Sequence, residues 1–200
     1  MTDLFKEKAK DWDANSKRMQ LSRAISGAIL EHVAFNTDMD VLDFGAGTGL
    51  VTSQIAPLVH TVTAVDISES MLEKLKEKNE LKDKVSTICQ DITKYPLSQK
   101  FDVIVSAMAM HHVEDTKDLL QKLASHLKPG GQIAIADLDT EDGSFHSAGT
   151  EGVFHNGFER DSLRASLEEI GFKSVRFVTA HTILGEKGSY PIFLMLGSKS

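Results

Sequence analysis

The sequence predicts an α/β fold in which a doubly wound, mostly parallel sheet carries helices on both faces. Residues 41–50 read Val-Leu-Asp-Phe-Gly-Ala-Gly-Thr-Gly-Leu, an apolar strand that turns into a helix through three glycines. Short apolar runs alternate with amphipathic helical patterns along the chain, and this alternation is typical of parallel strands joined by helical crossovers. The last two apolar runs are spaced like a hairpin, which would add one antiparallel strand.

Size and composition narrow the class of protein. The 200 residues suit a single domain over residues 1–200, and the net charge of −7 argues against a nucleic-acid partner. Cys89 is the only cysteine, which excludes an internal disulfide and fits a reducing cytoplasm. We expect no membrane partner, because the N-terminus is too charged for a signal peptide and the apolar stretch 103–110 is too short to span a bilayer. The oligomeric state is left open.

The first two thirds of the chain supply most of the predicted sheet. Residues 16–34 place apolar side chains at helical spacing behind a cap at Asn15 or Ser16, which predicts one long amphipathic helix. Strands are predicted at residues 41–44, 62–66, 85–89, 101–107 and 132–138. Helices are predicted at residues 68–78, behind a Ser68 cap, and at residues 116–127, before a Pro-Gly-Gly turn.

The last third of the chain has a different character. Residues 139–158 contain four glycines and no regular pattern, so we expect a long loop. A helix follows at residues 161–170, with Asp161 as its predicted N-cap and Gly171 as its C-cap. Strands are then predicted at residues 174–182 and 190–196, and residues 185–189 form the turn between them.

The glycine turn predicts a nucleotide-like ligand. Glycine permits backbone angles that a Cβ forbids and lets a ligand lie against the main chain. Gly45, Gly47 and Gly49 stand two residues apart, in place of the Gly-x-Gly-x-x-Gly spacing of dinucleotide-binding proteins. Asp43 stands just before the turn, where an acid suits a ligand with an ammonium group better than a pyrophosphate. A role for Asp43 in capping the loop is the alternative.

Two further acids close the next two predicted strands. Asp66 can accept hydrogen bonds from both hydroxyls of a ribose, as acids at this position do in many nucleotide sites. Asp91 can accept from an adenine amino group, while Ile67 and Ile92 pack on the ring. Carboxyl ends of parallel strands meet at one edge of a sheet, so we expect these acids around one ligand.

Together these motifs resemble the Rossmann-like S-adenosylmethionine-dependent methyltransferases, and in particular the quinone-biosynthesis type that acts on small molecules. The resemblance rests on the motifs at residues 41–49, 65–72, 90–92, 101–105, 111–115 and 127–131. It implies a seven-stranded sheet of order 3-2-1-4-5-7-6 with strand 7 antiparallel. It also implies S-adenosyl-L-methionine as the cofactor, with residues 45–49 along its methionine moiety, Asp66 on the ribose and Asp91 on the adenine.

The resemblance and the motifs give one set of candidate site residues. The candidate cofactor residues are Asp43, Gly45, Ala46, Gly47, Gly49, Asp66, Ile67, Met71, Asp91, Ile92 and Ala107. Met71 has helical spacing with Leu72 and Leu75, so core packing is its alternative role. We predict no metal site, because the spacing of His146, His155 and the nearby acids follows no ligand pattern.

The predicted reaction is a direct displacement that transfers a methyl group to a small-molecule acceptor. Its nucleophile needs positioning above all, and a base only if the acceptor must lose a proton. His111 and His155 are the candidate bases, although the pair His111 and His112 could instead position the loop and the cofactor. Residues 1–36, with Trp12, are expected to form a helical cap over the site, and residues 139–158 a substrate loop. The alternatives are that Trp12 anchors the first helix to the core and that residues 139–158 form a packed surface loop. The methylated atom, whether oxygen, nitrogen or carbon, is left open.

Two other functions fit part of the pattern. An NAD-dependent oxidoreductase would use the same glycine turn and Asp66, but it has less use for Asp91 and the terminal hairpin. A binding protein without methyl-transfer activity could retain the cofactor site alone. Binding of S-adenosylmethionine against NAD distinguishes the first alternative, and a screen of acceptors distinguishes the second.

Overall fold

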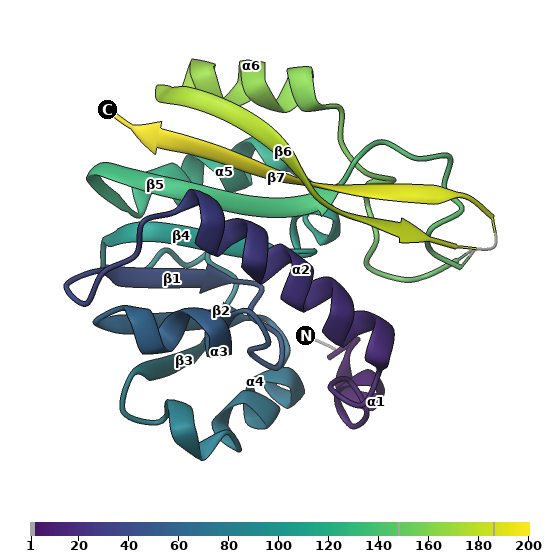
Figure 1. The fold of residues 1–200 in the computed structure, drawn as a ribbon, viewed down its shortest axis with the longest axis horizontal. Helices are drawn as coiled ribbons and strands as arrows, with labels where there is room; N and C mark the ends of the chain where they lie inside the picture. The colour runs from purple at the N-terminus through teal and green to yellow at the C-terminus, as the bar shows by residue number, and fades with distance from the viewer. Residues whose placement is uncertain (1–2, 148, 186) are drawn as a thin grey trace.

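The computed structural model describes residues 3–147, 149–185 and 187–200 and contains a seven-stranded sheet (Figure 1). The strands are β1 (Asp40–Phe44), β2 (Thr61–Asp66), β3 (Val85–Cys89), β4 (Phe101–Ala107), β5 (Leu127–Leu138), β6 (Phe172–Leu184) and β7 (Ser189–Lys199). Their order is β3-β2-β1-β4-β5-β7-β6, with β7 antiparallel to both of its neighbours. The predicted fold class and strand order are therefore confirmed.

Helices cover both faces of this sheet (Figure 1). They are α1 (Lys6–Ala9), α2 (Ser16–His32), α3 (Thr52–Ile55), α4 (Glu69–Lys76), α5 (Thr116–Ser125) and α6 (Arg160–Ile170), with short 3-10 helices η1 (Ala56–Leu58), η2 (Asn79–Leu81) and η3 (Met110–His112). Neighbouring residues of β1 show the two layers: Val41 packs in a cluster with α2, α3 and α4, and Leu42 in a cluster with α5 and α6. Successive side chains of a strand point to opposite faces, so each helix layer has its own core.

Several helix ends agree with the predicted caps, and one does not. The side chains of Asn15 and Ser68 accept backbone N–H groups at the starts of α2 and α4, and Gly171 takes a left-handed φ of 104° after α6. The predicted N-cap Asp161 is wrong, because Glu159 caps α6 by accepting from the backbone N–H of Ser162. Asp161 lies inside the first turn, where an acid also suits the helix dipole.

Strand β5 starts five residues earlier than predicted, and α5 is correspondingly shorter. The helix ends at Ser125, and Leu127 already pairs with Phe101 across the sheet. The pairing of β5 with β4 is irregular between Phe101 and Val103, opposite the Pro-Gly-Gly segment. A proline, which has no backbone N–H to donate, is tolerated at such an irregularity. Strands β6 and β7 also extend beyond their predicted ends and form the long hairpin of Figure 1.

The N-terminal part contains one element that was not predicted. Helix α1 is a single turn, too short for a periodic signal, and it packs beside α4. Four residues of predicted segments lie outside the described residues: residues 1–2 of the predicted cap, residue 148 of the loop and residue 186 of the hairpin turn.

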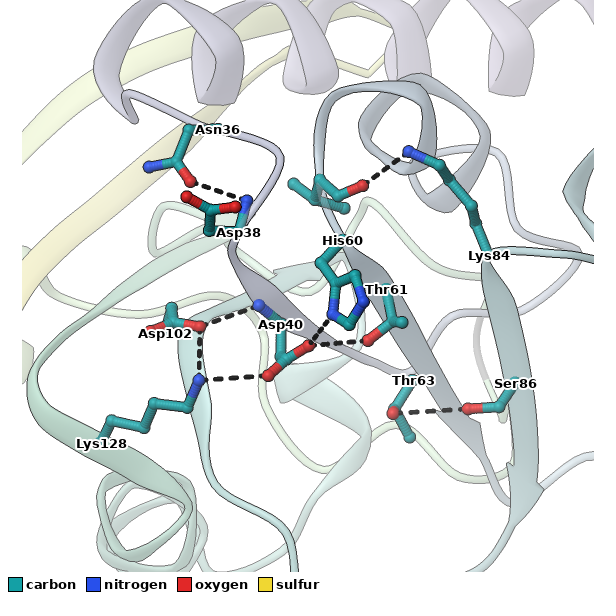
Figure 2. Close-up of polar contacts among 11 residues, drawn as sticks. Asn36, Asp38, Asp40, His60, Thr61, Thr63, Lys84, Ser86, Asp102 and Lys128 are labelled. Carbon is teal, nitrogen blue, oxygen red and sulfur yellow. Dashed lines mark hydrogen bonds and ion pairs between the residues drawn. The ribbon is translucent and has the colours of Figure 1, made fainter.

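A polar cluster joins the starts of three neighbouring strands (Figure 2). The Lys128 ammonium lies 3.1 Å from Asp40 Oδ2 and 2.7 Å from Asp102 Oδ2, and Asp102 also accepts the backbone N–H of Asp40. His60 and Thr61 contact the other carboxylate oxygen of Asp40 at 3.0 Å. This cluster holds β1, β4 and β5 together at the edge opposite to the glycine turn. In the described part of the chain, no helix is both long and apolar enough to cross a membrane.

Candidate functional site

A cavity of about 560 Å³ opens at the carboxyl ends of the parallel strands. This is the edge at which doubly wound sheets bind ligands. Its floor comes from the turn after β1 and from the ends of β2, β3 and β4. Residues near the N-terminus and Phe154 of the predicted substrate loop complete its walls. Among the residues that line it are Phe5, Trp12, Arg18, Leu21, Ile25, Asp43, Gly45, Ala46, Gly47, Thr48, Asp66, Ile67, Met71, Asp91, Lys94, Ala107, Met108, His112 and Phe154.

The glycine turn is fastened to the end of β2. The backbone N–H groups of Gly45 and Ala46 donate to Val65 O, and the N–H of Gly47 donates to Asp66 Oδ2 at 2.8 Å. Gly47 has a φ of 54°, and a Cβ built there would meet no heavy atom within 4 Å. The space in front of the turn is therefore open, so the turn can cradle a ligand against its main chain.

Asp43 is a buried carboxyl in β1, just before this turn. Its Oδ2 accepts the Thr52 hydroxyl at 2.5 Å, and burial raises its pKa to about 7. A buried acid without a cation is costly in its charged form. A cationic ligand group in the cavity would relieve this cost, which fits the predicted partner of Asp43, an ammonium.

The other two acids differ in what holds them. Asp66 also accepts the backbone N–H of Ser68, and burial raises its pKa despite the hydrogen bonds to its carboxylate. Burial alone would raise the pKa of Asp91, but hydrogen bonds from Thr93 and Lys94 outweigh burial and lower it. Asp91 lies two residues beyond the end of β3 and Asp66 is the last residue of β2. Both line the cavity, as their positions at the strand ends predict.

The structure brings nine of the eleven candidate cofactor residues to the cavity wall. These are Asp43, Gly45, Ala46, Gly47, Asp66, Ile67, Met71, Asp91 and Ala107. Gly49 and Ile92 do not line it. A Cβ at Gly49 would lie 2.2 Å from Leu75 Cδ1, so this glycine permits packing of the turn against α4. Ile92 is completely buried in the core on the α5 and α6 face.

The N-terminal strap, residues 3–15, borders the cavity and is fixed near both ends. At one end, Asp3 accepts the Ser68 hydroxyl and the backbone N–H of Ser70 at the start of α4. At the other end, Asp13 accepts the Thr48 hydroxyl of the glycine turn at 2.5 Å and pairs with Lys78 at 2.9 Å. The strap thereby places Phe5 and Trp12 in the cavity wall.

The adjacent histidines after β4 have different surroundings. His111 is 2% exposed, and Asp137 contacts both its ring Nδ1 at 2.7 Å and its backbone N–H. His112 lines the cavity, and its Nδ1 lies 2.6 Å from the carbonyl oxygen of Gly152. This carbonyl accepts the Nδ1 proton, so Nε2 carries the free lone pair. Burial lowers the pKa of His112 to about 4, with nearby His111 adding to the effect.

The histidines of the predicted substrate loop do not line the cavity. His155 Nε2 lies 2.9 Å from Val113 O and 3.1 Å from Glu114 O, so it fastens the loop to the segment after η3. His146 packs against His111 with ring centroids 5.1 Å apart, and burial lowers its pKa. Among the described residues, no three His, Cys, Asp or Glu side chains gather in a way that could hold a metal ion.

The structure adds wall residues that the sequence did not indicate. Arg18 and Met108 come from two separate segments, and nothing in their local sequence marks them as site residues, whereas Phe154 belongs to the predicted substrate loop. Met108 takes a positive φ of 57°, which is uncommon for a residue with a side chain. His112 could have been considered from the sequence, since it stands beside the candidate His111. The sequence does not indicate which of the two lines the cavity, because this depends on the backbone conformation of η3.

Comparison with known proteins places this site in a family. Residues 41–131 match the family model described as a methyltransferase domain. A ubiquinone biosynthesis O-methyltransferase of Coxiella burnetii is 30% identical over 142 residues, covering 68% of this chain and 60% of that protein. A malonyl-acyl-carrier-protein O-methyltransferase of Priestia megaterium is 27% identical over 179 residues, covering 83% of this chain and 63% of that protein.

The fold is shared with solved methyltransferase structures. That of an S-adenosylmethionine-dependent methyltransferase from Aquifex aeolicus superposes with a TM-score of 0.72 at 23% identity, over 100% of both chains. This chain spans between about half and just under two thirds of the length of the curated relatives it matches. The matched domain contains the glycine turn and the three strand-end acids, and the strand order is that of the resembling class. Residues 41–131 are therefore a methyltransferase domain, and the whole chain has the fold of the Rossmann-like S-adenosylmethionine-dependent methyltransferases.

Proposed function

We propose that this protein transfers a methyl group from S-adenosyl-L-methionine to a small-molecule acceptor. The observation that carries the proposal is the convergence of Asp43, Asp66 and Asp91 with the open glycine turn on one cavity. An oxidoreductase is not favoured, because the matched family and the strand order are those of methyltransferases. When bound, the cofactor supplies a methyl group already activated by its sulfonium.

Different cavity residues would bind different parts of the cofactor. Asp66 would accept from the ribose hydroxyls, and Asp91 from the adenine amino group, with Ile67 and Met71 beside the ring. Gly47 leaves room for the methionine moiety at the turn, and Asp43 offers a carboxylate to its ammonium. Residues 1–36 would act as the cap over the site and residues 139–158 as the acceptor loop, because Trp12 and Phe154 stand in the wall.

The acceptor we propose is a small molecule that loses a proton from oxygen. Two relatives with stated activities are both O-methyltransferases, and a hydroxyl acceptor needs a base. Of the candidate bases, His111 is buried behind the wall and His155 fastens the loop, so we assign the first proton acceptor to Nε2 of His112. His111 packs on His112 with ring centroids 4.2 Å apart and, held by Asp137, positions it.

Calorimetry with S-adenosylmethionine, S-adenosylhomocysteine and NAD tests the cofactor assignment. We expect binding of the first two and none of NAD; tight NAD binding without binding of the others would overturn the proposal. We also propose a cytoplasmic location, which the exposed free thiol of Cys89 fits.

The base assignment is tested in a screen of phenols and other hydroxyl acceptors. The His112→Asn variant should lose about 10²- to 10⁴-fold in turnover while its affinity for S-adenosylhomocysteine is retained. His60→Asn, at the opposite edge of the sheet, is the control and should keep its turnover. Unchanged turnover of His112→Asn would remove His112 from the mechanism and return the role to His111 or His155.

A further inference from the structure

His126 is a buried histidine outside the cavity wall, and both of its ring nitrogens have backbone partners. It follows the last residue of α5 and is 1% exposed. Its Nδ1 lies 2.7 Å from the carbonyl oxygen of Lys122, one turn earlier in the helix, and its Nε2 lies 2.9 Å from the backbone nitrogen of Leu97. A carbonyl oxygen only accepts and a backbone N–H only donates, so Nδ1 donates and Nε2 accepts. These two partners select one tautomer of the neutral ring.

The ring of His126 holds a segment that reaches the cavity. Residues 90–100 connect β3 to β4 and supply part of the cavity wall. At the start of the segment, the backbone N–H of Gln90 donates to the carbonyl oxygen of Asp66 at 3.0 Å. Just after its end, the N–H of Phe101 donates to the carbonyl oxygen of His126 at 2.8 Å. The segment is therefore fixed to β2 on one side and to His126 on the other.

The acid of this segment lies in a compact turn. The backbone oxygen of Asp91 accepts the N–H groups of Lys94 and Tyr95 at 3.2 and 2.9 Å. Pro96 is the single residue between this turn and Leu97, and its ring restricts its own φ and the conformation of the residue before it. A shift of Leu97 is therefore passed on to Asp91, because the link between them has little freedom to absorb it.

Ile92 and Lys100 also join this segment to the α5 side of the sheet. Ile92 is completely buried in the cluster with α5, but apolar burial favours contact and not a particular direction. Lys100 is exposed and donates to the carbonyl oxygen of Ser125, where water competes for both groups. His126 therefore supplies the buried, directional bond that determines where Leu97 lies.

We propose that His126 is a positioning residue for the recognition of the adenine amino group. This inference rests on the proposed function, in which Asp91 accepts a hydrogen bond from that group. The neutral ring holds Leu97, the link through Pro96 holds the turn, and the turn places Asp91 in the cavity wall. Without an acceptor at the position of Nε2, the N–H of Leu97 loses its partner and the turn is no longer fixed relative to α5.

Calorimetry with S-adenosylhomocysteine and S-inosylhomocysteine measures this recognition. The inosine compound has a carbonyl oxygen in place of the amino group, so the native protein should bind it at least about tenfold more weakly. In His126→Leu, the ratio of the two affinities should fall by about threefold or more. His126→Gln retains an amide oxygen that can accept the N–H of Leu97, so its ratio should lie closer to the native one. Lys100→Met is the control: it removes the exposed bond at the same helix end and should keep the native ratio.

The ratio of affinities distinguishes positioning from a purely structural role. A variant that is only less stable binds both compounds more weakly and keeps their ratio, and this result in His126→Leu overturns the proposal. A native protein that binds both compounds equally also overturns it. Where His126→Leu does not fold, a long-range proton–nitrogen correlation spectrum of the native protein reads the ring directly. A proton on Nδ1 and none on Nε2 supports the proposal, and the opposite tautomer overturns it, because Nε2 could not then accept from Leu97.

A different outcome concerns the proposed function. A native protein that binds neither S-adenosylmethionine nor S-adenosylhomocysteine overturns the proposed function, and amide hydrogen exchange of the ligand-free protein then decides whether His126 holds the segment. Residues 91–97 should exchange faster in His126→Leu than in the native protein, and at the native rate in Lys100→Met. Unchanged exchange of residues 91–97 in His126→Leu overturns the role of the ring.

Discussion

Gly47 combines a left-handed backbone with an open space in front of it. An alanine there would put its Cβ into the cavity, where nothing in the protein lies within 4 Å. We expect Gly47→Ala to fold, with a loss of about 1–2 kcal/mol from the positive φ, and to bind S-adenosylhomocysteine at least tenfold more weakly. Calorimetry and urea unfolding measure the two effects.

Gly130 provides a matched control for this substitution. It also has a positive φ, 76°, and an open space around its Cβ position, but it lies in β5 near the edge opposite to the cavity. Gly130→Ala should therefore lose similar stability and keep its ligand affinity. Equal ligand affinities of the two variants would show that the space in front of Gly47 is not used by the cofactor.

Asp43 should make the stability of the ligand-free protein depend on pH. Burial raises its pKa from 3.8 to about 7, so the folded state retains a proton that the unfolded chain releases near pH 4. The contribution of Asp43 to the free energy of unfolding is therefore largest below pH 4 and is lost as the pH rises to 7. The amide of an Asp43→Asn variant stays neutral and can still accept the Thr52 hydroxyl. As the pH increases from 4 to 7, the free energy of unfolding of Asp43→Asn should rise relative to that of the native protein by up to about 4 kcal/mol.

Urea unfolding of both proteins at several pH values between 4 and 8 measures this difference. A second readout comes from binding. A cationic cofactor favours the charged form of Asp43, so below pH 7 binding of S-adenosylmethionine should release a proton, and Asp43→Asn should release fewer. A stability difference that stays constant across the range would contradict the burial cost assigned to Asp43.

Single site residues differ in how well the sequence indicates them. Asp43, Asp66 and Asp91 could be predicted because each stands at the end of an apolar run, and strand ends of a parallel sheet converge. Arg18 could not, because its place in the cavity wall depends on the packing of α2 in the folded chain. The same limit applies to His111 and His112, which are neighbours in sequence and have different surroundings.

The N-terminal strap places Phe5 and Trp12 in the cavity wall, so its contacts should affect the release of a ligand. Asp13 holds it to Thr48 and Lys78, and its side chain is 38% exposed, so the ion pair contributes only modestly. We expect Asp13→Asn to release S-adenosylhomocysteine about two to five times faster, because a loss of up to about 1 kcal/mol corresponds to this range. Trp12 is the only tryptophan, so its fluorescence reports release in a stopped-flow experiment.

Asp11→Asn is the control for the strap, since Asp11 is exposed and only two residues from Asp13. It should release the ligand at the native rate. An unchanged rate in Asp13→Asn would mean that the contacts of Asp13 do not limit the exit of the ligand.

At the level of elements, periodicity could predict the sheet and the main helices but not every end. The strand at residues 101–107 was predicted with its observed bounds, because charge and turn residues delimit a short apolar run. The start of β5 was missed, since the Pro-Gly-Gly segment looks like a loop until Leu127 is seen to pair with Phe101. Helix α1 was missed because one turn has no period.

In the whole molecule, the two ends of the parallel strands carry different features. The cavity occupies the carboxyl ends of the strands, and the cluster of Lys128, Asp40 and Asp102 joins β1, β4 and β5 at the other ends (Figure 2). Stability and ligand affinity should therefore respond to different substitutions.

Lys128→Met tests this separation. Hydrogen bonds from His60 first, and then from Lys128, lower the pKa of Asp40, while Asp102 raises the pKa of Lys128. The stabilisation by Asp40 is present above pH 4 and is lost as the pH falls through its lowered pKa; that by Lys128 is present up to its ordinary pKa and is lost above it. The three side chains are 29–37% exposed, so we expect a loss of about 1 kcal/mol between pH 5 and 10.

This loss corresponds to a melting temperature about 2–4 °C lower for a chain of this size. It should diminish as the pH falls from 4 through the lowered pKa of Asp40, because protonated Asp40 no longer attracts Lys128. The affinity for S-adenosylhomocysteine should equal that of the native protein, because β1 still delivers Asp43 and the glycine turn to the cavity. If the folded Lys128→Met variant instead binds S-adenosylhomocysteine more weakly, the cluster affects the cavity through β1, and the two edges of the sheet are coupled.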